Sequence, residues 1–405
     1  MTKIGAWLIG ARGSLASTVL VGARAITHGL SGPGGLVTEL PDVAALPLAG
    51  LEQLVFGGWD VGSTPILERA RRMALEDRAL PEGLVAALED DLRAAELRVR
   101  PGVIEGRGPV TRGLNGARAA RQIEPLAAAI EQLEADLDRF RAEHRLDTII
   151  VVNVASTEPH ITLTPEHDSL EGIQRLIHLE RRASFTPSML YAYVALERGF
   201  PYVNFTPSLG IMPRGLQELG VKHGVPFYGS DGKTGETLMK TVLAPLFRCR
   251  NLEVMSWDGF NILGGGDGRV LSDPRHKQSK IRSKSGVLAS SLGYAPPGKV
   301  SIDYVPSLGN WNTAWDHIHF KGFLGTKMSA QFIWQGCDSI LAAPLVLDLI
   351  RLTEFAHRRG ESGPMVHLAS FFKNPLDVKV HGFTDQFAML LDYVEGHRTR
   401  LGRRR

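Results

Sequence analysis

The chain of 405 residues has very little cysteine, since Cys249 and Cys337 are its only two. They form no Cys-x-x-Cys pair and no His–Cys cluster, which argues against a disulfide scaffold and against a structural zinc site. We therefore predict no bound metal. Scarce, unpaired thiols also fit a reducing compartment, and we predict a cytoplasmic protein.

Long apolar runs are missing as well. No stretch approaches the roughly 20 apolar residues that a membrane span requires. The apolar start, MTKIGAWLIGARG, is interrupted by glycine and arginine too early for a secretory signal. We therefore expect no membrane as a partner.

Charge of one sign is not in excess, because 46 Lys and Arg stand against 43 Asp and Glu. A nucleic-acid-binding face usually shows basic excess together with aromatic residues that stack on bases. A strongly basic internal stretch, RHKQSKIRSKSG at residues 275–286, has no aromatic residue after it until Tyr294. We therefore expect no nucleic acid as a partner. The stretch is either a solvated loop or a group of ammonium ions aimed into a pocket, and Lys280 and Lys284 point the same way on a strand or a helix.

The chain begins with a pattern typical of a dinucleotide-binding βαβ unit. KIGAWLIG reads as a buried strand, SLASTVLVGARAITHG as a helix, and GARG lies between them. Gly10, Gly13 and Ala16 give G-x-x-G-x-x-A instead of G-x-G-x-x-G, so the motif alone is weak. Gly10 permits the tight turn, and the amides of Gly13, Ser14 and Leu15 open a helix whose positive end can hold a pyrophosphate. Small residues packing a helix on a strand remain the alternative.

Strand and helix patterns alternate from there to about residue 230, including a strand that ends at Asp60 and the fully apolar strand in DTIIVVNVAS. This order predicts an α/β fold with a Rossmann-like doubly wound domain, whose ligands bind at the carboxyl ends of the strands. From about 252 to 336 the pattern becomes β-rich, and a long buried helix follows. We predict a dinucleotide-binding domain in 1–235, an inserted α+β, β-rich catalytic and oligomerisation domain in 236–340, and a return to the first domain in 341–405.

The segment GSDGKTGETLMKTVLAPLF contains Gly232-Lys233-Thr234, as a phosphate-binding P-loop does. A P-loop would need glycine five residues before Gly232, where this chain has Phe227, so a P-loop is excluded. A turn that leads into a helix remains possible. Thr234, Gly235 and the amides after them would form an anion site, although Thr234 and Thr237 would serve equally as helix caps.

Six segments taken in order resemble the myo-inositol-1-phosphate synthase family along nearly the whole chain: FGGWD, GSDGKTGET, GDG…SKIRSKS, YVPSLG…W, CDSILAAPLVLDL and FFKNP. The resemblance implies a bound NAD that is reduced and reoxidised while D-glucose 6-phosphate is cyclised to inositol 1-phosphate. C5 is oxidised to a ketone, C6 loses a proton, the enolate attacks the C1 aldehyde, and the ketone is reduced. Each step forms or discharges negative charge on an oxygen, and preorganised ammonium groups stabilise such charge. The pocket interpretation of the basic stretch is therefore favoured.

The resemblance also implies roles for single residues. Lys280 and Lys373 would act at the C5 oxygen, and Lys284 near the phosphate or the C1 end. Thr234 and Gly235 would form the phosphate turn. Three acidic residues would lie beside the nicotinamide and tune the lysines, and a further set would contact the dinucleotide. These acids are Asp231, Asp267 and Asp338, and the dinucleotide contacts are Gly10, Arg12, Gly13, Ser14, Leu15, Asp60 and Ala155.

A homotetramer is the expected assembly. The family resemblance implies it, and the apolar strands in SAQFIWQG and NILGG offer more hydrophobic surface than one small sheet needs. Exposed strand edges and apolar sheet faces are usually covered by a partner.

The chain also departs from the family pattern. Asn310 and Asn312 stand where the family has Asp and Lys, Gly265 and Gly266 replace asparagines, and Ser230 replaces the first acid of a pair. Each lost hydrogen bond or charge at a polar site costs about 1–3 kcal/mol. Either Lys321 or Lys327 replaces the missing ammonium, or the substrate differs. The alternatives are a carbocycle-forming paralogue that uses another sugar phosphate such as fructose 6-phosphate, a net NAD-dependent dehydrogenase, and an inactive NAD-binding regulator.

Overall fold

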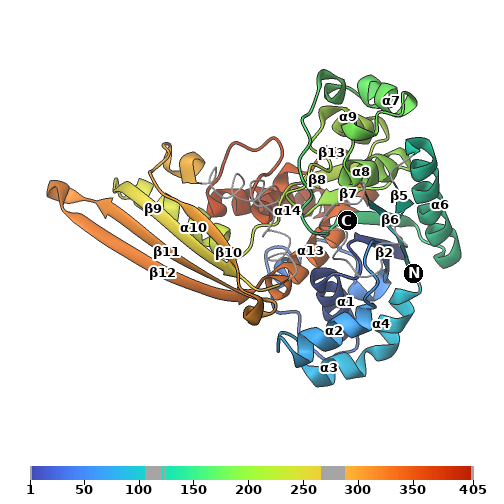
Figure 1. Cartoon of the computed structure of the whole chain (residues 1–405), viewed down its shortest axis with the longest axis horizontal. Helices are drawn as coiled ribbons and strands as arrows, with labels where there is room; N and C mark the ends of the chain where they lie inside the picture. The colour runs from blue at the N-terminus through green and yellow to red at the C-terminus, as the bar shows by residue number, and fades with distance from the viewer. Residues whose placement is uncertain (1, 105–120, 123–124, 266–287, 403–405) are drawn as a thin grey trace.

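The larger sheet contains seven parallel strands in the order β13-β8-β7-β6-β1-β2-β3 (Figure 1). The computed structural model describes residues 2–104, 121–122, 125–265 and 288–402. Strand order reverses between β1 and β6, and in doubly wound sheets ligands bind at the carboxyl ends of the strands at such a point. The strands are β1 (Ile4–Ile9), β2 (Leu54–Asp60), β3 (Val99–Pro101), β6 (Thr148–Asn153), β7 (Tyr202–Asn204), β8 (Pro226–Gly229) and β13 (Gly363–Pro364).

The central strands are apolar because helices cover both faces of a parallel sheet. Every residue of β1 and of β6 is buried. Helix α6 contacts β6, α8 contacts β7, and α13 reaches from β6 to β8 and packs on α1. The helices of this part are α1 (Ser14–Thr27), α2 (Ile66–Leu75), α3 (Glu82–Ala87), α4 (Glu89–Glu96), α6 (Leu126–His144), α7 (Leu170–His178), α8 (Pro187–Glu197), α9 (Arg214–Lys222), α13 (Asp338–Arg358) and α14 (Phe383–Gly402).

A second, mixed sheet of four strands extends away from the first (Figure 1). Its order is β10-β9-β11-β12, with β9 and β10 parallel and the other pairs antiparallel. The strands are β9 (Glu253–Leu263), β10 (Val300–Tyr304), β11 (Trp311–Lys321) and β12 (Lys327–Cys337). The predicted combination of a Rossmann-like domain with a separate β-rich part is therefore confirmed.

Helix α10 (Gly235–Cys249) packs on one face of the second sheet through a buried charged cluster. The Lys240 ammonium lies 2.5 Å from a Glu236 oxygen and 3.4 Å from an Asp316 oxygen on β11. Trp257 on β9 donates its indole N–H to the same Asp316 oxygen at 2.7 Å. A buried charge is stable only when it is paired in this way. The cluster therefore fixes the start of α10 relative to the sheet.

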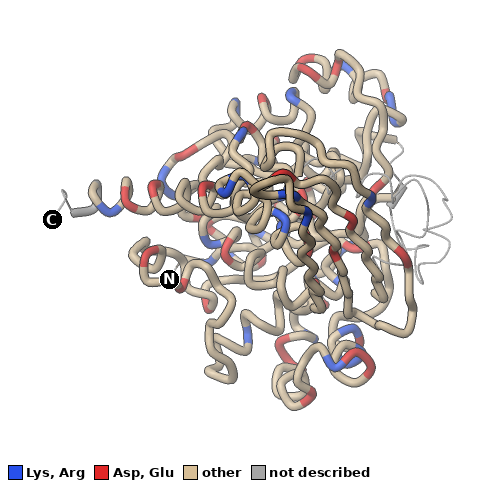
Figure 2. The backbone as a smooth tube through the Cα atoms, turned by 90° about the vertical axis from the view of Figure 1, so that its left-hand side faces the viewer, with Lys and Arg blue, Asp and Glu red and all other residues tan. Residues whose placement is uncertain are grey.

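Short elements complete the described chain. A two-residue pair joins β4 (Val103–Ile104) to β5 (Arg121–Gln122). The 3₁₀ turns are η1 (Val37–Glu39), η2 (Leu51–Gln53), η4 (Pro165–Asp168), η5 (Arg182–Ser184), η6 (Pro306–Leu308), η7 (Phe323–Gly325) and η8 (Val366–Phe371). None of the described helices combines the length and the apolar composition that a membrane span requires. Basic and acidic positions are interspersed along the described backbone (Figure 2).

Candidate active site

The turn between β1 and α1 lies at the carboxyl ends of β1 and β6. Gly10 has φ +87°, and a Cβ atom there would lie 2.8 Å from the Cα of Ala155, so only glycine fits this close approach. Helix α1 begins at Ser14, and its N-cap Gly13 brings no capping side chain. The first-turn amides, including that of Leu15, therefore remain available to an anion. This geometry fits the pyrophosphate of a dinucleotide.

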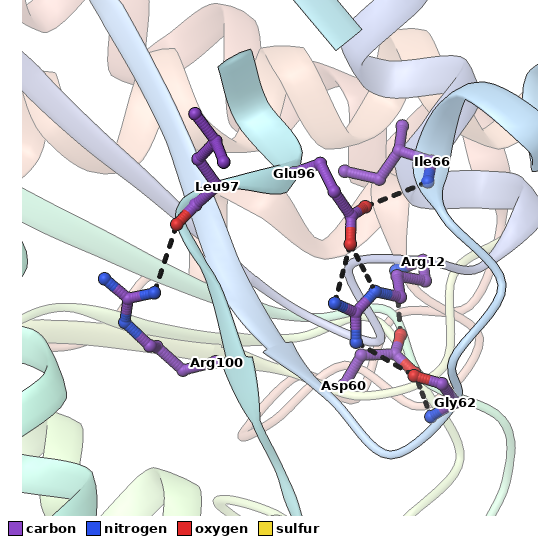
Figure 3. Close-up of polar contacts among 7 residues, drawn as sticks. All are labelled: Arg12, Asp60, Gly62, Ile66, Glu96, Leu97 and Arg100. Atoms are coloured by element: carbon purple, nitrogen blue, oxygen red, sulfur yellow. Dashed lines mark hydrogen bonds and ion pairs between the residues drawn. The ribbon is translucent and has the colours of Figure 1, made fainter. Parts of the chain in front are cut away.

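The side chains of Asp60 and Arg12 shape this turn (Figure 3). The Asp60 carboxylate, at the end of β2, accepts from the Arg12 amide at 2.7 Å and from the Gly62 amide at 2.6 Å. Burial raises the pKa of Asp60, and these two amides act in the opposite direction. The Arg12 guanidinium donates to one Glu96 oxygen at 2.8 and 2.6 Å, while the other oxygen accepts from the Ile66 amide at the start of α2. Arg12 is thus engaged within the protein, and its contact with a dinucleotide stays a prediction.

A second turn follows β8 and pairs with the distant segment FFKNP through main-chain hydrogen bonds. Ser230 donates to the Asn374 carbonyl at 2.8 Å, and Asn374 donates back at 3.1 Å. The amide of Lys373 donates to the Asp231 carbonyl at 2.7 Å. This pairing explains how residues more than 140 positions apart in the sequence form one site. Asp231 has φ +62°, which turns the chain toward α10.

Asp231 and Lys373 form a buried ion pair in this second turn. The Lys373 ammonium lies 2.9 Å from an Asp231 oxygen, and the side chains are 8% and 6% exposed. Hydrogen bonds between charged groups are strong in a dry environment. An ammonium group carries three N–H donors, so Lys373 can donate to a substrate oxygen as well as to Asp231. The arrangement is suited to stabilising an oxyanion or moving a proton.

The start of α10 forms the candidate phosphate turn. Thr234 is the N-cap without a capping side-chain hydrogen bond, and Gly235 follows with φ +56°. A Cβ atom on Gly235 would lie 3.6 Å from a carboxylate oxygen of Asp338. The other oxygen of Asp338 accepts from the side-chain amide of Asn312 at 2.6 Å. The predicted site residue Asp338 therefore lies beside the phosphate turn, with a neutral amide as its partner.

Lys233 is a residue of this site that the sequence did not reveal. Its side chain is buried, its ammonium donates to Gln386 on α14, and it lies 6.0 Å from the centre of the Phe383 ring. Burial, and then the charge of Lys373, lowers the pKa of Lys233 to about 7. The sequence showed Lys233 only as part of an excluded P-loop. Its position in the same turn as Asp231 was the available signal.

Three predicted site residues, Asp267, Lys280 and Lys284, lie outside the described residues. The expectation that Lys321 or Lys327 replaces the missing ammonium is not supported within this chain. Lys321 pairs with Glu253 at 2.7 Å and stands opposite Lys327 in the β11–β12 register. Asn312 is nine positions back along β11, about 30 Å away at the usual rise per residue. Over the described ranges, no group of three or more His, Cys, Asp and Glu side chains could hold a metal ion.

Comparisons with known proteins identify the family to which this chain belongs. Residues 4–394 fit the family model of myo-inositol-1-phosphate synthase, an NAD-binding family. The inositol-3-phosphate synthase 1 of Bacteroides thetaiotaomicron is 33% identical over 95% of this chain and 91% of its own. The human inositol-3-phosphate synthase 1 is 34% identical over 88% of this chain and 66% of its own. The crystal structure of inositol-3-phosphate synthase from Caenorhabditis elegans superposes with a TM-score of 0.85 at 25% identity, over 97% of this chain and 85% of its own. The chain therefore belongs to the myo-inositol-1-phosphate synthase family of NAD-dependent enzymes.

Proposed function

We propose that the protein cyclises D-glucose 6-phosphate to inositol 1-phosphate with NAD as a recycled cofactor. The observation that carries this proposal is the buried Asp231–Lys373 ion pair, in which Asp231 stands three residues before Thr234 of the turn at the start of α10. A phosphorylated sugar held by that turn would bring its ring oxygens toward a buried ammonium. Membership of the family supports the same substrate class.

The dinucleotide-binding residues fit NAD because the Gly10 turn leaves room for close backbone approach and α1 begins without a capping side chain. The amides of Ser14 and Leu15 would hold the pyrophosphate. Bound NAD supplies the hydride acceptor for C5 oxidation and the hydride donor for the final reduction. Asp60 keeps the turn in shape through the amides of Arg12 and Gly62.

In the proposed reaction Lys373, as the neutral amine, accepts the proton of the C5 hydroxyl as C5 is oxidised to the ketone. The ammonium so formed donates a hydrogen bond to the ketone oxygen and returns the proton to it in the final reduction. Asp231 orients the Lys373 ammonium and offsets the cost of burying it. Thr234, Gly235 and the following amides hold the phosphate. Lys280 is proposed as the second group at the C5 oxygen, and Lys284 as a cation near the phosphate or C1.

The experiment that tests the proposal is incubation of glucose 6-phosphate with the protein and a catalytic amount of NAD, followed by NMR of the product. The expected result is inositol 1-phosphate formed over many turnovers without accumulation of NADH. NADH formed in proportion to the product would instead identify a net dehydrogenase. No product with any sugar phosphate, despite bound NAD, would refute the proposed function.

One observation favours a second candidate substrate. Asn312 places a neutral amide against Asp338, where the family resemblance leads one to expect an ammonium group. A site with one fewer cation can prefer a different sugar phosphate, such as fructose 6-phosphate, with cyclisation to another carbocycle. Parallel incubations with the two hexose phosphates, compared by kcat/KM, decide between them.

We also propose the division into residues 1–235, 236–340 and 341–405, and a cytoplasmic homotetramer. The division is supported by β13, which returns the chain to the first sheet. The tetramer is supported by the outer face of the second sheet, where Phe260 stacks on Trp315 at 5.2 Å and Ile333 is 72% exposed. Apolar faces of that kind usually meet a partner. A stable monomer by light scattering at micromolar concentration would contradict this assembly.

A further inference from the structure

Asp77, in the loop after α2, binds the turn that leads into β11 of the second sheet. Its carboxylate accepts from the backbone amide of Asn310 at 3.1 Å and also from the side-chain amide of Asn310. Its carbonyl accepts from the indole N–H of Trp311 at 2.7 Å. Gly309, with φ +56°, has no room for a side chain, because a Cβ atom there would collide with the Asp77 carboxylate. Two segments separated by more than 230 positions are therefore fitted to each other.

Each of the two segments joined by Asp77 also contacts one of the two turns of the candidate active site. On one side, Asn312 follows directly and donates to Asp338, whose other oxygen lies beside Gly235. On the other side, Asp77 follows α2, from which Arg69 donates to the main-chain carbonyl of Arg12 at 3.3 Å. The Asp77 contact thus joins two segments, one of which contacts the dinucleotide turn through Arg69 and the other the phosphate turn through Asn312 and Asp338.

We propose that Asp77 is a positioning residue of the reaction: it holds the turn 309–312 so that Asn312 keeps Asp338 against the phosphate turn. This inference rests on the proposed function. A carboxylate only accepts hydrogen bonds, and Asn310 supplies two donors to it. An acid at position 310 would place two carboxylates at hydrogen-bonding distance. Asp77 therefore requires a hydrogen-bond donor at position 310, and Asn310 provides it.

The test is a double-mutant cycle in the full-length protein with Asn310→Asp, Asp77→Asn and the two combined. Asn310→Asp should raise the KM for glucose 6-phosphate about 10- to 100-fold, because it removes hydrogen bonds to a charged group and adds repulsion. NAD affinity should change less than about threefold, since the contacts proposed for the dinucleotide lie elsewhere. The double variant restores complementary partners, and its KM should be at least about tenfold lower than that of Asn310→Asp. Asp90→Asn, at an exposed position of α4, makes the same charge change as Asp77→Asn, is the control for that variant, and should leave KM unchanged.

A double variant no better than Asn310→Asp, or an Asn310→Asp variant with unchanged KM, would overturn the proposal. Should Asn310→Asp fail to fold, Asn310→Ala removes only the side-chain donor, and its KM should rise about 3- to 10-fold. Hydrogen exchange of residues 306–312 without substrate separates this proposal from the proposed function. Exchange should be faster in Asn310→Asp and restored in the double variant, even if the wild type turns over no sugar phosphate. Unchanged exchange in Asn310→Asp would refute the positioning role of Asp77 and would leave the proposed function untouched.

Discussion

Replacing Lys373 by methionine tests the centre of the proposed site. The Lys373 ammonium and the Asp231 carboxylate are 2.9 Å apart and almost fully buried. Methionine keeps much of the apolar stem and leaves the carboxylate without its cation, which costs about 3–5 kcal/mol of folding free energy. Adding Asp231→Asn removes the uncompensated charge. The double variant should therefore recover most of the lost stability in denaturant unfolding.

The turnover lost in Lys373→Met should not return when Asp231→Asn restores stability. A positioned acid–base group contributes roughly 10²–10⁴-fold in rate, and electrostatic stabilisation of the same oxygen contributes roughly 10²–10³-fold. We expect Lys373→Met to lower kcat at least about 100-fold, with or without Asp231→Asn. NAD affinity should persist, because the Gly10 turn is untouched. Lys222→Met, at the exposed end of α9, is the matched control.

The assay is product formation from glucose 6-phosphate with catalytic NAD, measured beside NAD binding and unfolding. A Lys373→Met variant that folds, binds NAD and keeps kcat within about threefold of the wild type would refute the role of Lys373. Recovery of activity together with stability in the double variant would show that the ion pair is structural only.

Three further variants test other features of the site. Asn312→Lys would place an ammonium beside Asp338 and should lower the KM for glucose 6-phosphate about threefold to tenfold; an unchanged or higher KM would contradict this. The pKa of Lys233 is lowered to about 7, so above pH 7 the unfolded chain binds its proton more tightly and Lys233 makes stability rise with pH. Between pH 7 and pH 9 the free energy of unfolding should therefore rise by about 2 kcal/mol more in the wild type than in Lys233→Met. Equal rises in the two proteins would refute a pKa of Lys233 lowered by burial. Lys280→Ala should lose at least about 100-fold in kcat while Lys277→Ala stays active, and the opposite result would show that the lysine register is wrong.

Local features of the fold were predictable from the sequence. The strand–GARG–helix start is a pattern of neighbouring residues, and it predicted the tight turn at Gly10. The close approach of Gly10 to Ala155, which excludes any side chain there, is a long-range contact that the pattern does not reveal. The change from alternating elements to a β-rich segment also follows from periodicity alone. These patterns depend on which faces of each strand or helix are buried, and such local features suffice to predict the fold class, which the structure confirms.

Long-range pairings were not predictable in the same way. Lys373 meets Asp231 only because FFKNP pairs with the turn after β8, and the family resemblance, not periodicity, brought the two residues together. Lys233 was missed because its burial depends on Gln386, 153 positions away. Lys321 was considered as a substitute because residue type does not reveal at which end of a long strand a side chain lies, and in this chain it lies at the other end of β11 from Asn312.

The described side chains of the site carry too little positive charge to bind a phosphate, which makes the basic stretch at residues 275–286 important. Asp231 and Lys373 cancel formally, Asp338 adds a negative charge beside the phosphate turn, and Lys233 is only partly protonated near neutral pH. The start of α10 contributes about half a positive charge. These groups cannot offset a phosphate dianion in a poorly hydrated site. If a sugar phosphate is the substrate, further cations must join from elsewhere in the chain or from a partner. Lys280 and Lys284 are the predicted candidates because their spacing directs both ammonium groups to the same side.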